Sequence, residues 1–445
     1  MTTTYTVTVT NSNGCQGTAT KVVTVIACGG TTTISGKIVF ENDDVTGVKN
    51  ATTNLTGAAA ASALTDVAGD YSMTVNATGN FSITPVKNIF RLNGVSSADV
   101  TRIQQHVLGN FPFTDPYKLV CADINHNNSV STQDVSILQQ SILGNPSALT
   151  LFNIFWRFTP STPALTLPPW GFAEKIDLVG ASGNQPNNNF IGMKIGDVTT
   201  PSADPAQGPQ IISPLIFSTQ DQALVAGQEI AVTIKAAHFE TLSSYQLALH
   251  FDINSLQYVG LETANSLDLS PSNFGFYNVA NGEIRSLWAG IENRSLATDA
   301  PVFILKFKAL KSGGFLSEYL NLMTSNPEIE CVAYTADAQP QELLLEYVSA
   351  STATNNPAQA SSMHLMQNRP NPFSSETTIG FFMPQAGEAQ LRIFDMQGRV
   401  IAESTCNCAA GYHSEQFELG NRAAGIYSYE LTTPFGTVVK KMVKQ

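Results

Sequence analysis

The chain has 445 residues, of which 35 are acidic and 23 basic, giving a formal net charge of -12. This length predicts about three to five domains. An acidic balance without a basic cluster argues against nucleic acid or an anionic membrane as a partner. No apolar run approaches the roughly 18 residues that a membrane-spanning helix needs, so we expect no transmembrane segment.

Two alternating stretches near the start of the chain, residues 5–10 and 21–26, flank a polar segment at residues 11–14 that contains asparagine and glycine. Alternation on both sides of such a segment predicts a β-hairpin. The hairpin resembles the closing hairpin of bacterial Ig-like repeats. This resemblance implies that residues 1–29 are the end of a truncated Ig-like domain.

Short strand-like segments recur between residues 32 and 87. Their order resembles the carboxypeptidase-regulatory-like β-sandwich, which is a spacer module in surface proteins. Asp66 and Asp70 fall in a predicted turn, where carboxylates accept local backbone hydrogen bonds. We therefore interpret them as turn residues rather than catalytic acids.

The next segment contains one pattern twice. From Val95 the chain reads Val-Ser-Ser-Ala-Asp-Val, and 35 residues later, from Val130, it reads Val-Ser-Thr-Gln-Asp-Val. A fixed period indicates a duplicated structural unit. Each copy has a serine N-cap, apolar residues at helical spacing and a terminating glycine. These are Ser96, Val100, Ile103, Val107 and Gly109 in the first copy, and Ser131, Val135, Leu138, Ile142 and Gly144 in the second. The sequence predicts two helices that bury their apolar stripes on each other.

The loop before the second helix has oxygen-bearing side chains at the spacing of a calcium loop. Its positions 1, 3, 5, 7 and 12 are Asp123, Asn125, Asn127, Ser129 and Asp134. Ca²⁺ takes six to eight oxygen ligands, and Ser129 would contribute its backbone carbonyl. Position 6 needs a sharp turn, and Asn128 there tolerates a left-handed backbone. We predict one Ca²⁺ site here; an Asn/Asp-rich turn that binds no metal is the alternative.

The matching loop of the first copy is a poor metal site. Its corresponding positions are Asn88, Phe90, Leu92, Gly94 and Asp99. Two of the three leading ligand positions are therefore apolar, and we predict a single calcium site rather than two. Because Asp123 and Asp134 alone bring charge to it, we expect weak binding, with a Kd on the order of 10⁻⁴–10⁻³ M.

The repeats, which read Asp-Val-x-x-Ile/Leu-Gln-Gln, resemble type I dockerins, and more closely the dockerin-like modules of secreted proteins from one Gram-negative phylum. In that subgroup the repeats are followed by segments like Trp156-Arg157-Phe158 and Lys194-Ile195-Gly196-Asp197-Val198, which are present here. The resemblance implies a module spanning residues 88–200. It also suggests that Asp197 returns to complete a second calcium site; a simple turn cap is the alternative.

Residues 201–210 are rich in proline and predict a linker. The strand-like segments of residues 211–349 predict a two-sheet sandwich. Their order resembles a cohesin, the partner fold of dockerins, and we expect Trp288 to lie in its core. A carbohydrate-binding role is an alternative that requires a row of exposed aromatic side chains. The candidates for that row are Tyr258, Phe274, Phe276 and Tyr277.

After a polar linker at residues 350–362, the segment 363–445 contains motifs at residues 365–373, 391–400 and 424–431. They resemble the type A C-terminal sorting domain of the type IX secretion system. This resemblance implies a small β-sandwich, the secretion machinery as a partner, and a secreted or outer-membrane surface location.

The six cysteines show no zinc-type spacing. Cys15 and Cys28 flank one predicted strand and could form a disulfide. Cys406 and Cys408 are expected to be too close for an easy one.

The sequence contains no recognisable catalytic motif. We expect a mainly β protein, a string of Ig-like and jelly-roll sandwiches with one small helical calcium-binding module, acting as a non-catalytic adhesive region of an exported surface protein. Helix faces at Ser97-Ala98 and Thr132-Gln133 could dock on the cohesin-like sandwich of a neighbouring copy and build a filament or ring. Intramolecular stacking is one alternative. Another is an accessory tail of a secreted hydrolase whose catalytic domain lies upstream.

Overall fold

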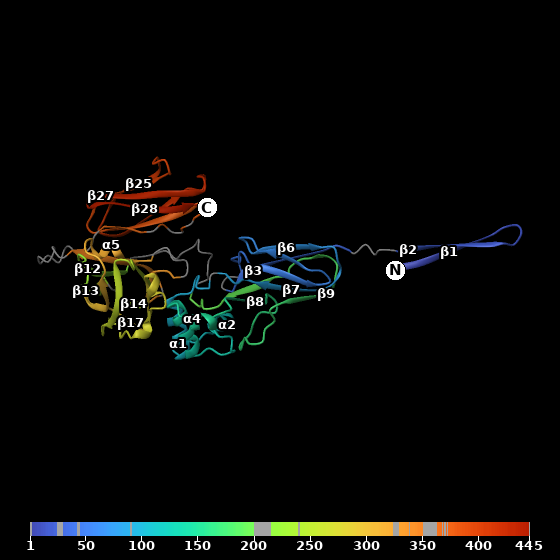
Figure 1. Ribbon diagram of the computed structural model, residues 1–445, viewed down its shortest axis with the longest axis horizontal. Helices are drawn as coiled ribbons and strands as arrows, with labels where there is room; N and C mark the ends of the chain where they lie inside the picture. Colours follow the sequence, from blue (N-terminus) through green and yellow to red (C-terminus); the bar gives the residue numbers. More distant parts are fainter. Residues whose placement is uncertain are drawn as a thin grey trace. The chain divides into compact units, whose positions relative to one another are not determined.

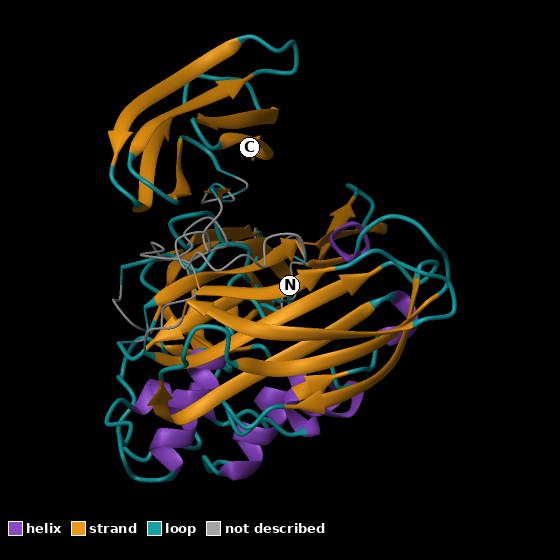
Figure 2. Cartoon of the chain, turned by 90° about the vertical axis from the view of Figure 1, so that its left-hand side faces the viewer, coloured by secondary structure: helices purple, strands orange, loops and turns teal. Residues whose placement is uncertain are grey.

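The computed structural model describes residues 2–24, 30–41, 45–89, 91–199, 215–238, 241–323, 329–337, 339–349, 363–366, 368, 371 and 373–444. Strands dominate and the helices are few and short, so the predicted mainly β fold is confirmed (Figure 2). The chain forms two compact units. One comprises residues 1–87, 158–164 and 172–192, and the other comprises residues 88–157, 165–171 and 193–445. In the part of the chain that is described, no helix has both the length and the apolar character needed to span a bilayer.

The chain begins with the predicted hairpin of β1 (Thr2–Thr10) and β2 (Gln16–Thr24), which pair antiparallel throughout (Figure 1). The side chain of Asn11 accepts the backbone N–H groups of Asn13 and Cys15 and so shapes the turn. Cys15 is an exposed free thiol. Its expected partner Cys28 and the linkers at residues 201–210 and 350–362 lie outside the described residues.

The first sandwich consists of two sheets, with strand orders β10-β3-β11-β8 and β5-β4-β7-β9, and β6 also pairs with β3. Its strands are β3 (Thr32–Phe40), β4 (Thr52–Gly57), β5 (Ala61–Leu64), β6 (Asp70–Val75), β7 (Gly79–Val86), β8 (Trp156–Pro160), β9 (Ile176–Ala181), β10 (Gly183–Gln185) and β11 (Phe190–Lys194). Asp66 accepts the N–H groups of Ala68 and Asp70, as expected of a turn residue.

The expected module at residues 88–200 differs from the structure at this point. Strand β11 is buried along its length and pairs parallel with β3, with Phe190 opposite Ile38. Strand β9 pairs with β7 of the other sheet. Residues 158–164 and 172–192 therefore belong to the first sandwich. Local spacing does not reveal a partner strand that lies far upstream in the chain.

The duplicated segment folds into the two predicted helices, α1 (Ser97–Val107) and α3 (Thr132–Ile142), with Ser96 and Ser131 at their N-caps. Gly109 and Gly144 follow them with φ of 77° and 81°, left-handed values that end a helix at little steric cost. Two further helices, α2 (Pro116–Ala122) and α4 (Pro146–Leu151), begin at proline after an Asp or Asn cap. We call residues 88–152 with the return segment 193–199 the helical module.

The second sandwich follows, with the strand order β15-β18-β13-β12-β21-β20-β14-β17-β16 and β19 on β14. Its elements are β12 (Leu215–Asp221), β13 (Glu229–His238), β14 (Leu242–Phe251), β15 (Leu256–Thr263), η1 (Pro271–Asn273), β16 (Phe274–Gly275), η2 (Val279–Asn281), β17 (Glu283–Arg294), β18 (Pro301–Ala309), α5 (Leu316–Tyr319), β19 (Leu320–Leu322), β20 (Val332–Thr335) and β21 (Pro340–Ser349). Its core contains Tyr245, Phe303 and Phe307, and Trp288 is buried with them as predicted.

The C-terminal sandwich has one sheet of order β22-β23-β26 and another of order β25-β24-β27-β28. Its strands are β22 (His364–Leu365), β23 (Glu376–Met383), β24 (Gly387–Phe394), β25 (Val400–Cys408), β26 (Gly411–Glu418), β27 (Gly425–Thr433) and β28 (Gly436–Lys444). The expectation for Cys406 and Cys408 is wrong, because they form a disulfide. Residues two apart on a strand point to the same side, and their Cα atoms are 5.4 Å apart, within the range that a disulfide bridges.

Tyr429 ties the entry segment of the C-terminal sandwich to its core, and its loss is expected to weaken this domain. The buried hydroxyl donates to the Met366 carbonyl at 2.7 Å and accepts the Asn368 N–H at 2.9 Å. Tyr429→Phe should destabilise the domain by about 1–3 kcal/mol, because both backbone groups lose this partner. Differential scanning calorimetry of the whole chain measures the effect. Tyr277→Phe, at an exposed position of the second sandwich, is the control; equal melting profiles of the two variants would contradict the role of Tyr429.

Candidate functional site

The predicted calcium loop is a hydrogen-bonded turn between α2 and α3. Asp123 accepts the N–H groups of Asn127 at 3.1 Å and Asn128 at 2.8 Å through its two carboxylate oxygens. Asp134 Oδ1 accepts the Ile124 N–H at 3.0 Å, which brings position 12 back against the start of the loop. Asn128 has φ of 65°, so the left-handed backbone expected at position 6 is confirmed.

Two buried carboxylates lie near each other in this loop. Asp123 and Asp134 are both fully buried. Burial raises the pKa of Asp123, and the nearby negative charge of Asp134 raises it further, while hydrogen bonds from Asn128 and Asn127 oppose the rise. A bound cation would relieve this repulsion between neighbouring carboxylates.

The structure brings Asp123, Asn125 and Asp134 together, and the Asn125 side chain accepts the Asn127 N–H at 3.1 Å. Asn127 and Ser129 lie on the exposed rim of the same turn. The described residues contain no cluster of three or more His, Cys, Asp or Glu suited to a metal. Any cation here would therefore depend on amide and carbonyl oxygens beside two carboxylates, which is the chemistry of a weak Ca²⁺ site.

The first loop is closed by protein donors. Asp99, at its position 12, accepts five hydrogen bonds. Oδ2 takes the N–H and hydroxyl of Ser96, and Oδ1 takes the N–H of Val198 at 2.7 Å together with the N–H and hydroxyl of Thr199. We call Asp99, Val198 and Thr199 the clasp. Both oxygens of this carboxylate accept hydrogen bonds, and the donors on Oδ1 come from the distant return segment. Phe90, at position 3 of this loop, lies outside the described residues.

The return segment is anchored beside the clasp. Lys194 is buried, and its Nζ donates to the Arg91 carbonyl at 2.6 Å. The same ammonium lies 5.8 Å from the ring centre of Phe155 and 6.0 Å from that of Trp156. Gly196 donates its N–H to the Cys121 carbonyl at 2.8 Å. The sequence motif Lys-Ile-Gly-Asp-Val thus closes the helical module, and its Asp197 is buried within it.

The N-terminal end of α1 lies against the second sandwich. The Ser97 N–H donates to Gln246 Oε1 at 2.8 Å, and Ser97 Oγ donates to Ser244 Oγ at 3.1 Å. Gln246 Nε2 donates to the Glu330 carbonyl at 3.1 Å, which orients the amide oxygen toward the helix. Tyr334 is half-buried here, and desolvation of its hydroxyl raises the pKa while a hydrogen bond with Ser96 opposes the rise.

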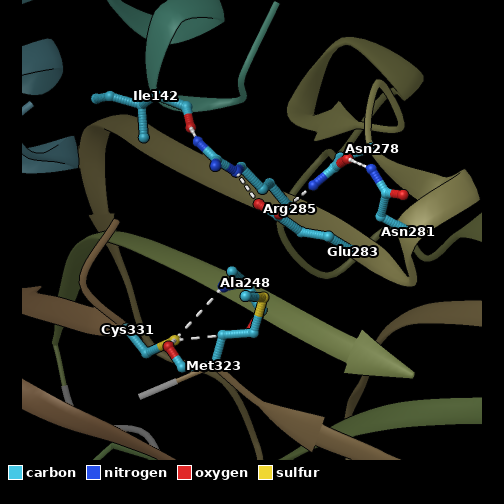
Figure 3. Close-up of polar contacts among 8 residues, drawn as sticks. All are labelled: Ile142, Ala248, Asn278, Asn281, Glu283, Arg285, Met323 and Cys331. Atoms are coloured by element: carbon cyan, nitrogen blue, oxygen red, sulfur yellow. Dashed lines mark hydrogen bonds and ion pairs between the residues drawn. The ribbon is translucent and has the colours of Figure 1, made fainter. Parts of the chain in front are cut away.

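The C-terminal end of α3 makes the second contact. Arg285 Nη1 donates to the Ile142 carbonyl at 3.0 Å, and Glu283 pairs with the Arg285 guanidinium (Figure 3). Asn278 Nδ2 donates to the same Glu283 carboxylate at 2.6 Å. The charge of this nearly buried arginine is therefore compensated while it caps the helix. We call the surface of β14, β16 and β17 that meets the helices the docking face.

A glycine lets the backbones approach closely at the docking face. A Cβ added to Gly275 would lie 2.0 Å from the Leu143 carbonyl oxygen. Beside it, Gln140 Nε2 donates to the Ser272 carbonyl at 3.1 Å. No recognisable motif marks Gly275, Arg285 or Gln246, so these site residues were not predicted.

The two repeats meet the docking face unequally. Ser97 and Ala98 are buried, whereas their counterparts Thr132 and Gln133 are exposed. At the other helix ends, Leu143 is 1% exposed and its counterpart Leu108 is 54% exposed. Of the two helix faces expected to dock, the first is used within the chain, together with the end of the second helix.

The aromatic residues considered for carbohydrate binding do not form an exposed row. Phe274 is buried, and Tyr258 and Phe276 stack on each other at 5.0 Å as part of the core wall. Tyr277 alone among the four is exposed. This arrangement does not favour a sugar-binding platform on the second sandwich.

Cys331 is a packing residue of the same sandwich. It accepts the Ala248 N–H at 3.4 Å and donates to the Met323 carbonyl at 3.5 Å (Figure 3). Burial raises the pKa of this thiol to about 11, which keeps it protonated at neutral pH.

Two family models match parts of the chain. Residues 218–330 match the cohesin domain, and residues 369–445 match the secretion system C-terminal sorting domain. The chain therefore contains a non-catalytic interaction domain and an export domain, and the latter indicates a secreted or surface-attached protein. No curated protein sequence matches the chain.

Solved structures similar to part of this chain include three that contain cohesins. The sixth cohesin from scaffoldin B of Acetivibrio cellulolyticus, solved with a Cel5 dockerin mutant, is 14% identical and covers 31% of this chain and 98% of its own, with a TM-score of 0.25. A type I cohesin-dockerin complex from Clostridium thermocellum is 16% identical and covers 32% of this chain and 99% of its own, with a TM-score of 0.25. A non-cellulosomal cohesin from Archaeoglobus fulgidus is 15% identical and covers 32% of this chain and 94% of its own, with a TM-score of 0.21.

Gly275→Ala is expected to loosen the docking contact, because its new Cβ would clash with a backbone carbonyl that has little freedom to move. The amide protons in the last turn of α3 should exchange about tenfold faster or more, measured by hydrogen exchange and mass spectrometry. Gly260→Ala on β15 is the control, since its Cβ would meet no atom within 4 Å. Unchanged protection in Gly275→Ala would show that the contact does not need this close approach.

Proposed function

We propose that this chain is a non-catalytic interaction region of an exported surface protein, in which the helical module is the resident partner of the cohesin-like sandwich. The observation that carries this proposal is the pair of buried contacts at Ser97 and Arg285, one at each end of the duplicated helices. The cohesin match supports it, since a cohesin is an interaction domain. The resemblance of the repeats to dockerins supports it from the other side.

In this proposal Ca²⁺ stiffens the turn that leads into α3. Asp123 and Asp134 would supply the charged oxygens, Asn125 and Asn127 the amide oxygens, and Ser129 its carbonyl. The metal would compensate two buried carboxylates that otherwise repel each other. The first sandwich would act as a spacer of the carboxypeptidase-regulatory-like kind, and the sorting domain would direct export.

A second candidate function is assembly between copies, in which a helical module docks on the sandwich of a neighbour to give a filament or ring. The exposed Thr132, Gln133 and Leu108 favour it, because they occupy the repeat positions that match Ser97, Ala98 and Leu143 of the docking contact.

Calcium is expected to bind the chain weakly and to raise its melting temperature. Isothermal titration calorimetry should give a Kd on the order of 10⁻⁴–10⁻³ M, and Ca²⁺ at about ten times Kd should stabilise the module by about 1.4 kcal/mol. Asp134→Asn should abolish the heat because it removes one of two charged ligands. Asp252→Asn, which alters a turn of the second sandwich, should bind as the parent does. Absence of both heat and thermal shift in the parent would refute the calcium site.

Assembly between copies predicts a mass above that of one chain in sedimentation velocity at about 0.1 mM protein. Gln133→Ala should then shift the population toward single chains, because Gln133 lies on the exposed helix face that would meet the neighbour. Gly260→Ala should not. A single-chain mass for the parent under these conditions would exclude the second candidate and leave the docking within one chain untouched.

A further inference from the structure

We infer that docking of the helical module on the cohesin-like sandwich does not require calcium, because the clasp takes the place of a metal at the docking end of α1. This inference rests on the proposed function for the docking contact and the calcium loop. It assigns Asp99 a positioning role and confines the proposed metal to the loop of the second repeat, while both repeats contribute contacts to docking.

The clasp lies directly beside the docking contact. Asp99 is two residues from Ser97, whose N–H and hydroxyl contact Gln246 and Ser244. The Asp99 carboxylate organises the first turn of α1 through Ser96 and ties it to Val198 and Thr199. A calcium ion in a helix-preceding loop would fix the same turn through the same carboxylate. Protein donors already do so here.

The second docking contact is remote from the calcium loop. Ile142 and Leu143 lie at the C-terminal end of α3, while the loop precedes its N-terminus. A helix of 11 residues separates them, a rise of roughly 16 Å. The loop itself faces solvent at Asn127, Asn128 and Ser129, and the adjoining Thr132 and Gln133 are exposed. Loss of the metal would therefore loosen the start of α3, and this loosening would affect that end of the helix before it affected either docking contact.

The test is disulfide trapping in the full chain. Ser97→Cys with Ser244→Cys places two thiols where the parent has hydroxyl oxygens 3.1 Å apart. Mass spectrometry of the cross-linked peptide separates this bond from the native cysteines. Thr132→Cys with Ser244→Cys is the matched control, since Thr132 is the repeat counterpart of Ser97 and is exposed. The docked pair should form the bond at least about tenfold faster than the control.

The decisive comparison is between about 5 mM Ca²⁺ and excess EGTA. The docked pair is expected to form its disulfide at rates that agree within about twofold in Ca²⁺ and in EGTA. A fall in EGTA to the rate of the Thr132 control would overturn the inference while leaving the calcium site intact. Failure of the calcium titration in the parent would instead refute the metal part of the proposed function.

Matched substitutions in the two repeats test the clasp itself. Asp134→Asn in the trapping background should abolish the calcium heat and leave trapping within about twofold. Asp99→Asn should retain the calcium heat and slow trapping by about tenfold or more, because an amide cannot accept five hydrogen bonds at these donors. Trapping at the parent rate in Asp99→Asn would overturn the clasp. If Asp99→Asn also loses the calcium heat, Thr199→Val decides the question, and a parent rate in that variant would overturn the clasp.

Discussion

The ends of the duplicated helices depend on groups supplied by the cohesin-like sandwich. A helix leaves N–H groups unpaired at its start and carbonyls unpaired at its end. Here the Ser97 N–H finds Gln246, and the Ile142 carbonyl finds Arg285. A guanidinium at a helix C-terminus also complements the helix dipole. Because Glu283 compensates Arg285 and Gly275 allows the close approach, these contacts define the orientation in which the helical module is held.

The two copies of the repeat share their helix pattern but differ in the surroundings of the carboxylate at position 12. Both retain a serine cap, a buried apolar stripe and a terminating glycine. The carboxylates at the matching positions differ in surroundings. Asp99 accepts hydrogen bonds from Val198 and Thr199 of the return segment, whereas Asp134 lies near the second carboxylate of its own loop, Asp123. Asp134 also accepts four hydrogen bonds, but all come from its own loop and cap, whereas Asp99 is tied to the distant return segment.

Local patterns predicted much of this architecture. The helices α1 and α3 followed from apolar residues at helical spacing, the hairpin β1-β2 from alternation around an Asn/Gly segment, and the left-handed Asn128 from its position in the loop. Each of these depends on residues near one another in the chain. The Ca²⁺ ligands stay a prediction, and the structure places Asp123, Asn125 and Asp134 in one hydrogen-bonded turn.

Interactions between distant segments were the ones that sequence reasoning could not supply. Gln246 and Arg285 lie on strands, and their role is visible only in the folded chain, where they contact the ends of the two helices. Asp99 accepts hydrogen bonds from its neighbour Ser96 and from Val198 and Thr199, which lie about 100 residues further along the chain. The Cys406–Cys408 bond departs from the expectation based on sequence separation, because residues two apart on a strand point to the same side.

The parallel pairing of β3 with β11 bears on how the chain is made. Ile38 lies opposite Phe190. About 150 further residues must therefore be synthesised before β11 can cover this edge of strand β3. The whole helical segment is synthesised in the interval. An uncovered strand edge is a template for pairing with other chains. Biosynthesis of the first sandwich therefore carries a period of exposure to aggregation that ends when β11 arrives, and a chaperone that shields strand edges would act in that period.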